Sequence, residues 1–267
     1  MTADRSHVAP REWDATSYHQ VSAPQTSWGH KVLARLTLDG DERVIDAGCG
    51  SGRLTAALAE RLPRGRIVAL DRSVNMLTVA RTNLRPAFGA RMSFVQAALP
   101  HVPFAGWADV IFSTATFHWV ADHPALFAHL HTALRPGGRL HAQCGGGPNL
   151  AAAHALAEEV MADAPFAPCF ADWNAVWQFA SADETADRLT RAGFRHIETS
   201  LEAAPTTLAS ADDYRAFVTT VIYHAHLARL PADMHAAFID AVTVRAAATN
   251  PPFTLDYWRL NMTARRA

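Results

Sequence analysis

The sequence predicts an α/β fold in which a mostly parallel sheet carries helices on both faces. Three observations support this prediction. Short apolar runs alternate with stretches whose leucines repeat at helical spacing, a glycine-rich turn directly follows the first run, and the alternation persists as far as Cys144. Strands that alternate with helices in this way form parallel sheets covered on both sides.

The elements of the first half follow one another without long gaps. Apolar runs predict strands at 43–47, 67–70, 92–96, 109–112 and 140–144. Leucines that repeat every four residues predict helices over 54–62 and 126–134, and Ser73 is the expected N-cap of a helix between them.

The alternation of strand and helix patterns ends after Cys144. Residues 145–180 contain several aromatic side chains but no strand pattern, so we interpret this stretch as an insertion. The pattern Ser181-x-x-Glu184 is a capping box, which begins the next helix.

The last part of the chain predicts two strands around a helical pair. The first strand covers 194–201, and a second capping pattern at Ser210 begins the helical pair over 211–248. In the final strand, 253–264, the apolar residues change phase, which favours a bulge or twist at an edge of the sheet.

The composition excludes several classes of protein. With 267 residues, 49% hydrophobic and 18% charged, the chain can form a folded core and is not a disordered tail. A formal charge of −1 provides no basic field for nucleic acid. The partner is therefore expected to be a small molecule. No apolar run can cross a bilayer and the start lacks a signal-peptide pattern, so we expect a cytoplasmic protein. We expect it to be a monomer or a homodimer.

No metal site is expected. The three cysteines are an odd number without C-x-x-C spacing, which favours free thiols over disulfides or zinc ligation. Among the histidines, His129 and His131 lie two residues apart, as do His224 and His226, and residues at this spacing point to different faces of a helix.

The turn Gly48-Cys49-Gly50-Ser51-Gly52 predicts a site for a nucleotide-like ligand. Glycines let a ligand approach the backbone N–H groups and the positive end of the following helix. Arg53 stands where the dinucleotide fingerprint needs a small residue, which disfavours NAD, and no lysine follows to grip a phosphate.

Asp71 ends the second strand, beside the glycine turn. A carboxylate at this place can accept both hydrogens of a ribose diol. The alternative is that Asp71, at an exposed strand end, only caps the N-terminus of the following helix.

Four segments together resemble the successive motifs of class I S-adenosylmethionine-dependent methyltransferases: 44–52, Asp71, 109–113 and 134–140. The resemblance implies S-adenosylmethionine as cofactor and a Rossmann-like, doubly wound, mostly parallel seven-stranded sheet with an added helical cap. It implies four parts: an N-terminal lid segment 1–40, a cofactor-binding core 41–144, a cap insertion 145–180, and a C-terminal half 181–267 that contains the helical insertion 211–248.

The same resemblance implies roles for individual residues. Asp46 would orient the methionine amino group, Gly48 and Gly50 would pass near the methionyl part, and Asp71 would hold the ribose. The remaining cofactor-binding positions are Ala47, Arg72, Met76, Gln96, Ala97, Ala98 and Ser113. Arg72 and Met76 would flank the adenine. Alanine at 98 replaces the acid usual in this family, so the adenine would be read by backbone groups or by Gln96.

The broader outline resembles the trans-aconitate and juvenile hormone acid methyltransferase groups, which methylate carboxylates. By this resemblance Gln25 and Trp119 would donate hydrogen bonds to the acceptor carboxylate. A carboxylate is already ionised at neutral pH, so the enzyme has to align and desolvate it rather than remove a proton. Gln25 and Ser27 align with arginines of the trans-aconitate group, which favours an apolar monocarboxylate over a tricarboxylate.

Two other functions stay open from the sequence. The first is a phenol, hydroxyl or carbon methyltransferase that uses His118 as general base. The second is a protein that binds S-adenosylmethionine without transferring the methyl group. Aromatic side chains outside the core sheet could line an apolar cap over the acceptor, namely Trp28, Phe170, Trp173, Trp177 and Tyr223.

Overall fold

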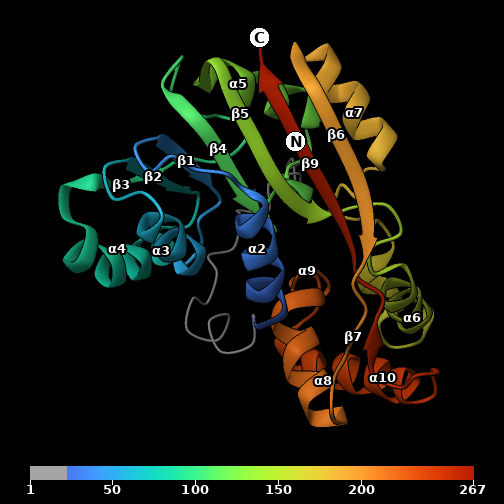
Figure 1. Cartoon of the computed structure of the whole chain (residues 1–267). Helices are drawn as coiled ribbons and strands as arrows, with labels where there is room; N and C mark the ends of the chain where they lie inside the picture. Colours follow the sequence, from blue (N-terminus) through green and yellow to red (C-terminus); the bar gives the residue numbers. More distant parts are fainter. Residues whose placement is uncertain (1–22) are drawn as a thin grey trace, which may run out of the picture.

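A computed structural model describes residues 23–267, with side chains from Ser27 onward. Its main sheet has seven strands in the order β3-β2-β1-β4-β5-β9-β6 (Figure 1). The strands are β1 (Arg43–Ala47), β2 (Arg66–Asp71), β3 (Met92–Gln96), β4 (Ala108–Thr114), β5 (Leu134–Gly145), β6 (Phe194–Ala203) and β9 (Trp258–Arg266). The first five pair in parallel, and β9 runs antiparallel to both of its neighbours. The predicted doubly wound, mostly parallel sheet is confirmed.

Helices cover both faces of the sheet because successive residues of its central strands point to opposite sides. In β1, Val44 joins a core with α2 (Ala23–Arg35), α3 (Arg53–Glu60) and α4 (Val74–Phe88). The next residue, Ile45, joins the opposite core with α5 (His123–Ala133) and α7 (Ala182–Arg191). Both side chains are fully buried, as a doubly covered sheet requires.

The cap contains four α-helices and a short two-stranded antiparallel sheet. Its elements are α6 (Ala151–Ala162), α8 (Ala211–Phe217), α9 (His224–Leu227), α10 (His235–Ala247), β7 (Thr206–Thr207) and β8 (Thr254–Leu255). A π-helix, η4 (Val218–Ile222), joins α8 to α9, and the cap also contains the 3-10 turns η3 (Ala167–Phe170) and η5 (Ala232–Met234). Two other 3-10 turns, η1 (Gly89–Arg91) and η2 (Phe117–Trp119), follow α4 and β4. Figure 1 shows the cap helices beyond the C-terminal ends of β4 and β5.

The two predicted cap segments form one unit with a hydrophobic core of its own. Tyr223, from the second segment, donates its hydroxyl to the Ala153 carbonyl of the first at 2.7 Å. Phe238 and Val242 are fully buried in the same core, which also takes in Trp28 from α2. The aromatic side chains of the two segments therefore pack chiefly against one another.

The last strand differs from the prediction. β9 is an internal strand between β5 and β6 rather than an edge strand. The change of apolar phase occurs where the chain leaves the small sheet at Leu255 and enters the main sheet at Trp258, so it marks a change of sheet. Within residues 23–267, every helix is too short or too polar to span a bilayer.

Candidate active site

Asp71, the last residue of β2, holds the glycine turn between β1 and α3. One carboxylate oxygen accepts the Gly50 N–H at 2.9 Å, and the other accepts the Ser73 N–H at 2.9 Å. Burial raises the pKa of Asp71, and the two backbone bonds only partly offset this effect. Each oxygen keeps a second lone pair, so a carboxylate that shapes the turn can also accept ribose hydroxyls.

The glycine turn packs tightly on one side and faces open space on the other. Gly48 has φ +83°, and a Cβ there would lie 2.2 Å from Oγ1 of Thr116. Gly50 has φ +53°, but a Cβ there would meet no atom within 4 Å. The open space at Gly50, just before the start of α3, leaves room for the nucleotide-like cofactor that the sequence predicts.

Asp46 lies beneath this turn and is 3% exposed. Its Oδ2 accepts the hydroxyl of Thr55 at 2.6 Å. Burial raises the pKa of Asp46 to about 7, and the negative charge of Asp71 adds to this effect, whereas the Thr55 bond lowers the value. The structure thus places Asp46 at the base of the turn, and its contact with the methionine amino group stays a prediction.

Ser113, near the end of β4, is 1% exposed and donates its hydroxyl to the Ala47 carbonyl at 2.6 Å. This bond fixes the end of β1 to β4. Ser113 therefore positions the backbone from which the glycine turn begins.

The residues predicted to surround adenine meet at the ends of β2 and β3. Gln96 pairs with Asp71 in the parallel ladder and donates its side-chain amide to the Arg72 carbonyl at 3.3 Å. The Ala97 N–H donates to the Asp71 carbonyl at 3.0 Å, and Met76 is buried in the first turn of α4. The structure brings these positions together with Ala98, while their contacts with adenine stay predictions.

His118 lies in η2, directly after β4, and is buried. Its Nδ1 accepts the backbone N–H of Gly145, at the end of β5, at 3.2 Å. Burial lowers the pKa of His118 to about 3, and the positive charges of Arg259 and His123 contribute to this shift. The imidazole is therefore neutral at physiological pH, and its proton is on Nε2 because Nδ1 acts as the acceptor.

A cavity lies between the strand ends and the cap. The residues that line it come from the segments after β4 and β5, from the cap and from the start of β9: Ala115, His118, Trp119, Asn149, Leu150, His154, Trp177, Phe179, Val221, Ile222, Tyr257 and Arg259. Ala115 directly precedes Thr116, which contacts the glycine turn. The cavity is therefore next to the predicted cofactor site and is our candidate acceptor site.

The structure brings together some of the predicted acceptor-site residues and not others. His118, Trp119 and Trp177 line the cavity, whereas Tyr223 is fully buried inside the cap core. Gln25 belongs to α2, but its side chain lies outside the described residues. The three cysteines are free, and the described residues contain no group of three or more side chains that could hold a metal ion.

Sequence reasoning assigned no role to Asn149, His154 and Arg259, which are among the residues that line the cavity. Arg259 is 4% exposed, and its guanidinium lies 4.6 Å from the Trp28 ring centre and 4.9 Å from that of Tyr257. Its only local signal is an arginine among apolar residues in a predicted strand. Such a pattern does not tell whether the guanidinium points to solvent or into a cavity.

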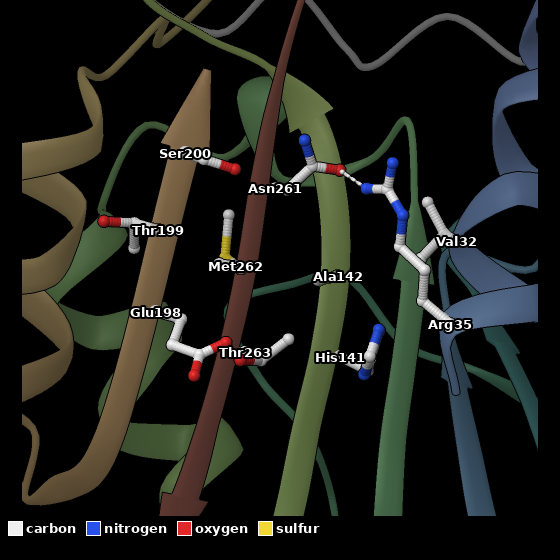
Figure 2. Close-up of a pocket in the computed structure, with 10 residues that line it drawn as sticks. All are labelled: Val32, Arg35, His141, Ala142, Glu198, Thr199, Ser200, Asn261, Met262 and Thr263. Carbon is white, nitrogen blue, oxygen red and sulfur yellow. Dashed lines mark hydrogen bonds between the residues drawn. The ribbon is translucent and has the colours of Figure 1, made fainter. Parts of the chain in front are cut away.

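A larger cavity of about 290 Å³ lies elsewhere, on the face of β5, β9 and β6 (Figure 2). Its wall includes Arg35 from α2, which donates to Asn261 Oδ1 at 3.3 Å. This cavity is lined by mid-strand residues rather than by strand ends. Open parallel sheets bind ligands at the strand ends, so we place the active site at the smaller cavity.

The chain resembles known enzymes over most of its length. A methyltransferase-domain profile matches residues 44–138. A trans-aconitate 2-methyltransferase of Rhodopseudomonas palustris (strain BisB18) is 31% identical over 250 residues, which cover 90% of this chain and 92% of the relative. The chain belongs to the S-adenosylmethionine-dependent methyltransferases. A trans-aconitate 2-methyltransferase of Acidovorax ebreus is 36% identical over 137 residues, so the match spans about half of that relative, 49% of its length.

Solved structures show the same fold. Phosphoethanolamine N-methyltransferase 2 of Haemonchus contortus, in complex with S-adenosylhomocysteine, gives a TM-score of 0.61 at 16% identity over 94% of this chain and 56% of that one. The [4+2]-cyclase SpnF gives 0.58 at 18% identity over 90% and 80%. The cofactor of this methyltransferase is S-adenosylmethionine. Asp71 keeps oxygen lone pairs that can accept its ribose hydroxyls.

Proposed function

We propose that the protein transfers the methyl group of S-adenosylmethionine to the carboxylate of a small, fairly apolar acid. The family supplies the cofactor chemistry. The cavity next to the glycine turn supplies the acceptor site, because it combines aromatic and aliphatic walls with hydrogen-bond donors.

The hydrogen bond from Gly145 to His118 carries this proposal. A general base needs a free lone pair, and the lone pair of the neutral His118 ring already accepts the Gly145 N–H at 3.2 Å. The other ring nitrogen bears a proton, so His118 can offer a ligand only an N–H donor. A carboxylate uses such a donor and needs no base, whereas a phenol or alcohol needs a base to become a nucleophile.

The residues around His118 fit the same chemistry. Trp119 can donate only from its indole nitrogen, and its ring lies 5.8 Å from that of Trp177. The walls formed by Trp177, Phe179 and Leu150 exclude water from the acceptor. Partial desolvation makes the carboxylate more reactive, while the donors orient one oxygen toward the methyl group that the cofactor supplies.

The relatives named for trans-aconitate support carboxylate methylation, but the cavity favours a simpler acid. Arg259 is the single cationic side chain among the described residues that line it. A tricarboxylate would bring three negative charges into a cavity with largely apolar walls, which is costly. We therefore propose an acid with one carboxylate and an apolar body.

One further function is supported by a specific comparison. SpnF, a [4+2]-cyclase, shares the fold, so the fold by itself does not establish methyl transfer. A protein that binds the cofactor without using its methyl group is the second candidate.

Incubation of the pure protein with methyl-labelled S-adenosylmethionine decides between these functions. The acceptor panel contains fatty, aromatic and polycarboxylic acids together with phenols, alcohols and amines. We expect base-labile labelled methyl esters from apolar monocarboxylic acids. In the Trp119→Phe variant, kcat/KM should fall about tenfold to 150-fold, the loss expected for one hydrogen bond to a charged group, with little change in cofactor affinity. Labelled ethers would favour the phenol or hydroxyl alternative, and cofactor binding without any labelled product would refute methyl transfer to these acceptors.

A further inference from the structure

We propose that His123 is a positioning residue for the acceptor site, because it holds the short turn η2 on which His118 lies. This inference rests on the proposed function, since residues of η2 line the candidate acceptor cavity. His123 is the first residue of α5, is 3% exposed and is not part of the cavity wall. It therefore acts on a ligand only through the residues that it binds.

The two hydrogen bonds of the His123 ring define its protonation. Nδ1 lies 2.9 Å from Nη1 of Arg188, a residue of α7 that can only donate. Nε2 lies 3.0 Å from the Phe117 carbonyl oxygen, which can only accept. Burial lowers the pKa of His123; the bond to Phe117 opposes this shift, and the positive charge of Arg188 adds to it. The ring is therefore neutral and carries its proton on Nε2, where it is donated to Phe117.

Neither helix capping nor core packing requires a histidine at this position. Asp122 already caps α5, since its Oδ1 accepts the Ala125 N–H at 2.9 Å. The His123 ring packs against Phe127, a residue of the apolar core, with 5.7 Å between the ring centres. An apolar side chain of similar size would fill this space without the cost of burying two polar atoms. The polarity of His123 therefore matters for the Phe117 carbonyl, to which one of these atoms binds.

Hydrogen bonds from outside η2 fix its peptide groups. The Phe117 carbonyl accepts the Val120 N–H at 3.0 Å, which closes the turn, and also accepts the proton of His123. The next carbonyl, that of His118, accepts the Gln178 N–H at 2.9 Å, while the His118 ring accepts a backbone N–H of β5 at 3.2 Å. The hydrogen-bond geometry within a 3-10 turn is poor, so the outside bonds determine how the groups of η2 are oriented.

Loss of the His123 bond should therefore change the state of the His118 ring. Without this bond, the peptide group between Phe117 and His118 can rotate, and Nδ1 of His118 no longer faces the Gly145 N–H. The ring then exchanges between its two tautomers, and part of the population presents a lone pair instead of an N–H to the acceptor. A carboxylate requires the N–H, so use of the acceptor should fall.

The state of the ring can be measured without any turnover. ¹⁵N NMR spectra of the histidine rings are recorded on the protein saturated with S-adenosylhomocysteine, and the His118 signals are identified by their loss in His118→Gln. We expect the proton of His118 on Nε2 in the wild type and in His123→Gln, whose amide can both accept from Arg188 and donate to Phe117. In His123→Leu both tautomers should be populated.

Two further variants complete this experiment. His129→Leu is the matched control, because the His129 ring also binds a backbone carbonyl of α5, that of Ala125 at 2.8 Å. It should leave the His118 signals unchanged. Arg188→Met removes the donor to His123 from the partly exposed side of the network, and it should shift the His118 signals in the same direction as His123→Leu.

Kinetics with benzoate as acceptor measure the effect on the reaction. In His123→Leu, kcat/KM should fall roughly fivefold or more, the loss expected for a buried hydrogen bond, while the Kd for S-adenosylhomocysteine stays unchanged. The same substitution is then made in the His118→Gln background. If His123 acts through His118, it should cause little further loss there.

The outcomes separate this inference from the proposed function. Unchanged His118 signals in His123→Leu, with lower stability alone, would indicate a structural role and overturn the inference; if that variant does not fold, Arg188→Met decides in the same way. Additive losses in the His118→Gln background would also overturn it. If the His118 tautomers change as expected but no acid yields a methyl ester, the proposed function fails and this inference stands. If esters form and His123→Leu keeps the wild-type kcat/KM, only this inference fails.

Discussion

Replacement of Asp71 by asparagine should weaken both the glycine turn and the cofactor site. The carboxylate accepts one backbone N–H on each oxygen, both at 2.9 Å. Asparagine can accept on one side only, and its NH₂ group would face a second donor on the other side. A lost charge-assisted bond costs about 1.5–3 kcal/mol, so the free energy of unfolding should fall by about this amount. A domain with a stability of about 5–15 kcal/mol stays folded.

The cofactor should lose affinity by a comparable factor. If the second lone pairs of Asp71 accept the ribose hydroxyls, the loss of one such bond corresponds to a rise in Kd of roughly tenfold to 150-fold. Isothermal titration calorimetry with S-adenosylhomocysteine measures the affinity, and urea unfolding measures the stability of the same sample.

Asp109 provides the matched control for this experiment. It is another half-buried carboxylate at a strand of the same sheet, where it accepts the Arg43 N–H at 2.7 Å and pairs with Arg135. It lies at the start of β4, away from the C-terminal strand ends. Asp109→Asn should destabilise the protein but leave the cofactor affinity unchanged. An unchanged Kd in Asp71→Asn, or equal changes of Kd in both variants, would refute the ribose role.

Three further predictions concern protonation and the glycine turn. In ¹⁵N NMR spectra of the histidine rings, identified by the loss of signals in His118→Gln, His118 should stay neutral between pH 5 and 8 with its proton on Nε2; a titration near pH 6.5 would contradict this. The Asp46 pKa of about 7 lies above its unfolded value of 3.8, so its contribution to stability is complete below about pH 4 and is lost as the pH rises through 7. Relative to Asp46→Asn, the wild type should lose about 1.4 kcal/mol of its unfolding free energy per pH unit between these values, and a difference between the two proteins that does not change with pH would count against it. Gly48→Ala should lower the free energy of unfolding far more than Gly50→Ala, because only the former places a Cβ against Thr116, and similar unfolding free energies for the two variants would show that this contact relaxes.

Features that depend on neighbouring residues could be predicted from the sequence. The capping box is an example, since Ser181 accepts the Glu184 N–H and Glu184 accepts the Ser181 N–H as its spacing requires. The glycine turn and the following helix also form where the pattern places them. By contrast, the internal position of β9 depends on its pairing with β5 and β6, which are far away in the chain. Apolar phase alone cannot give that pairing.

The chemistry of the acceptor site depends on contacts between residues that are far apart in the sequence. The segment Phe117-His118-Trp119 is compatible with a histidine base and with a histidine donor. The choice depends on Gly145, whose N–H reaches His118 Nδ1 only because β5 lies beside β4. Arg259 likewise lines the cavity because Asn149, 110 residues earlier, binds its guanidinium. Since each strand of a parallel sheet ends at the same edge, residues distant in sequence meet there and determine one another's protonation and orientation. Family motifs can therefore locate the cofactor, while the identity of the acceptor depends on which distant side chains face the cavity beside it.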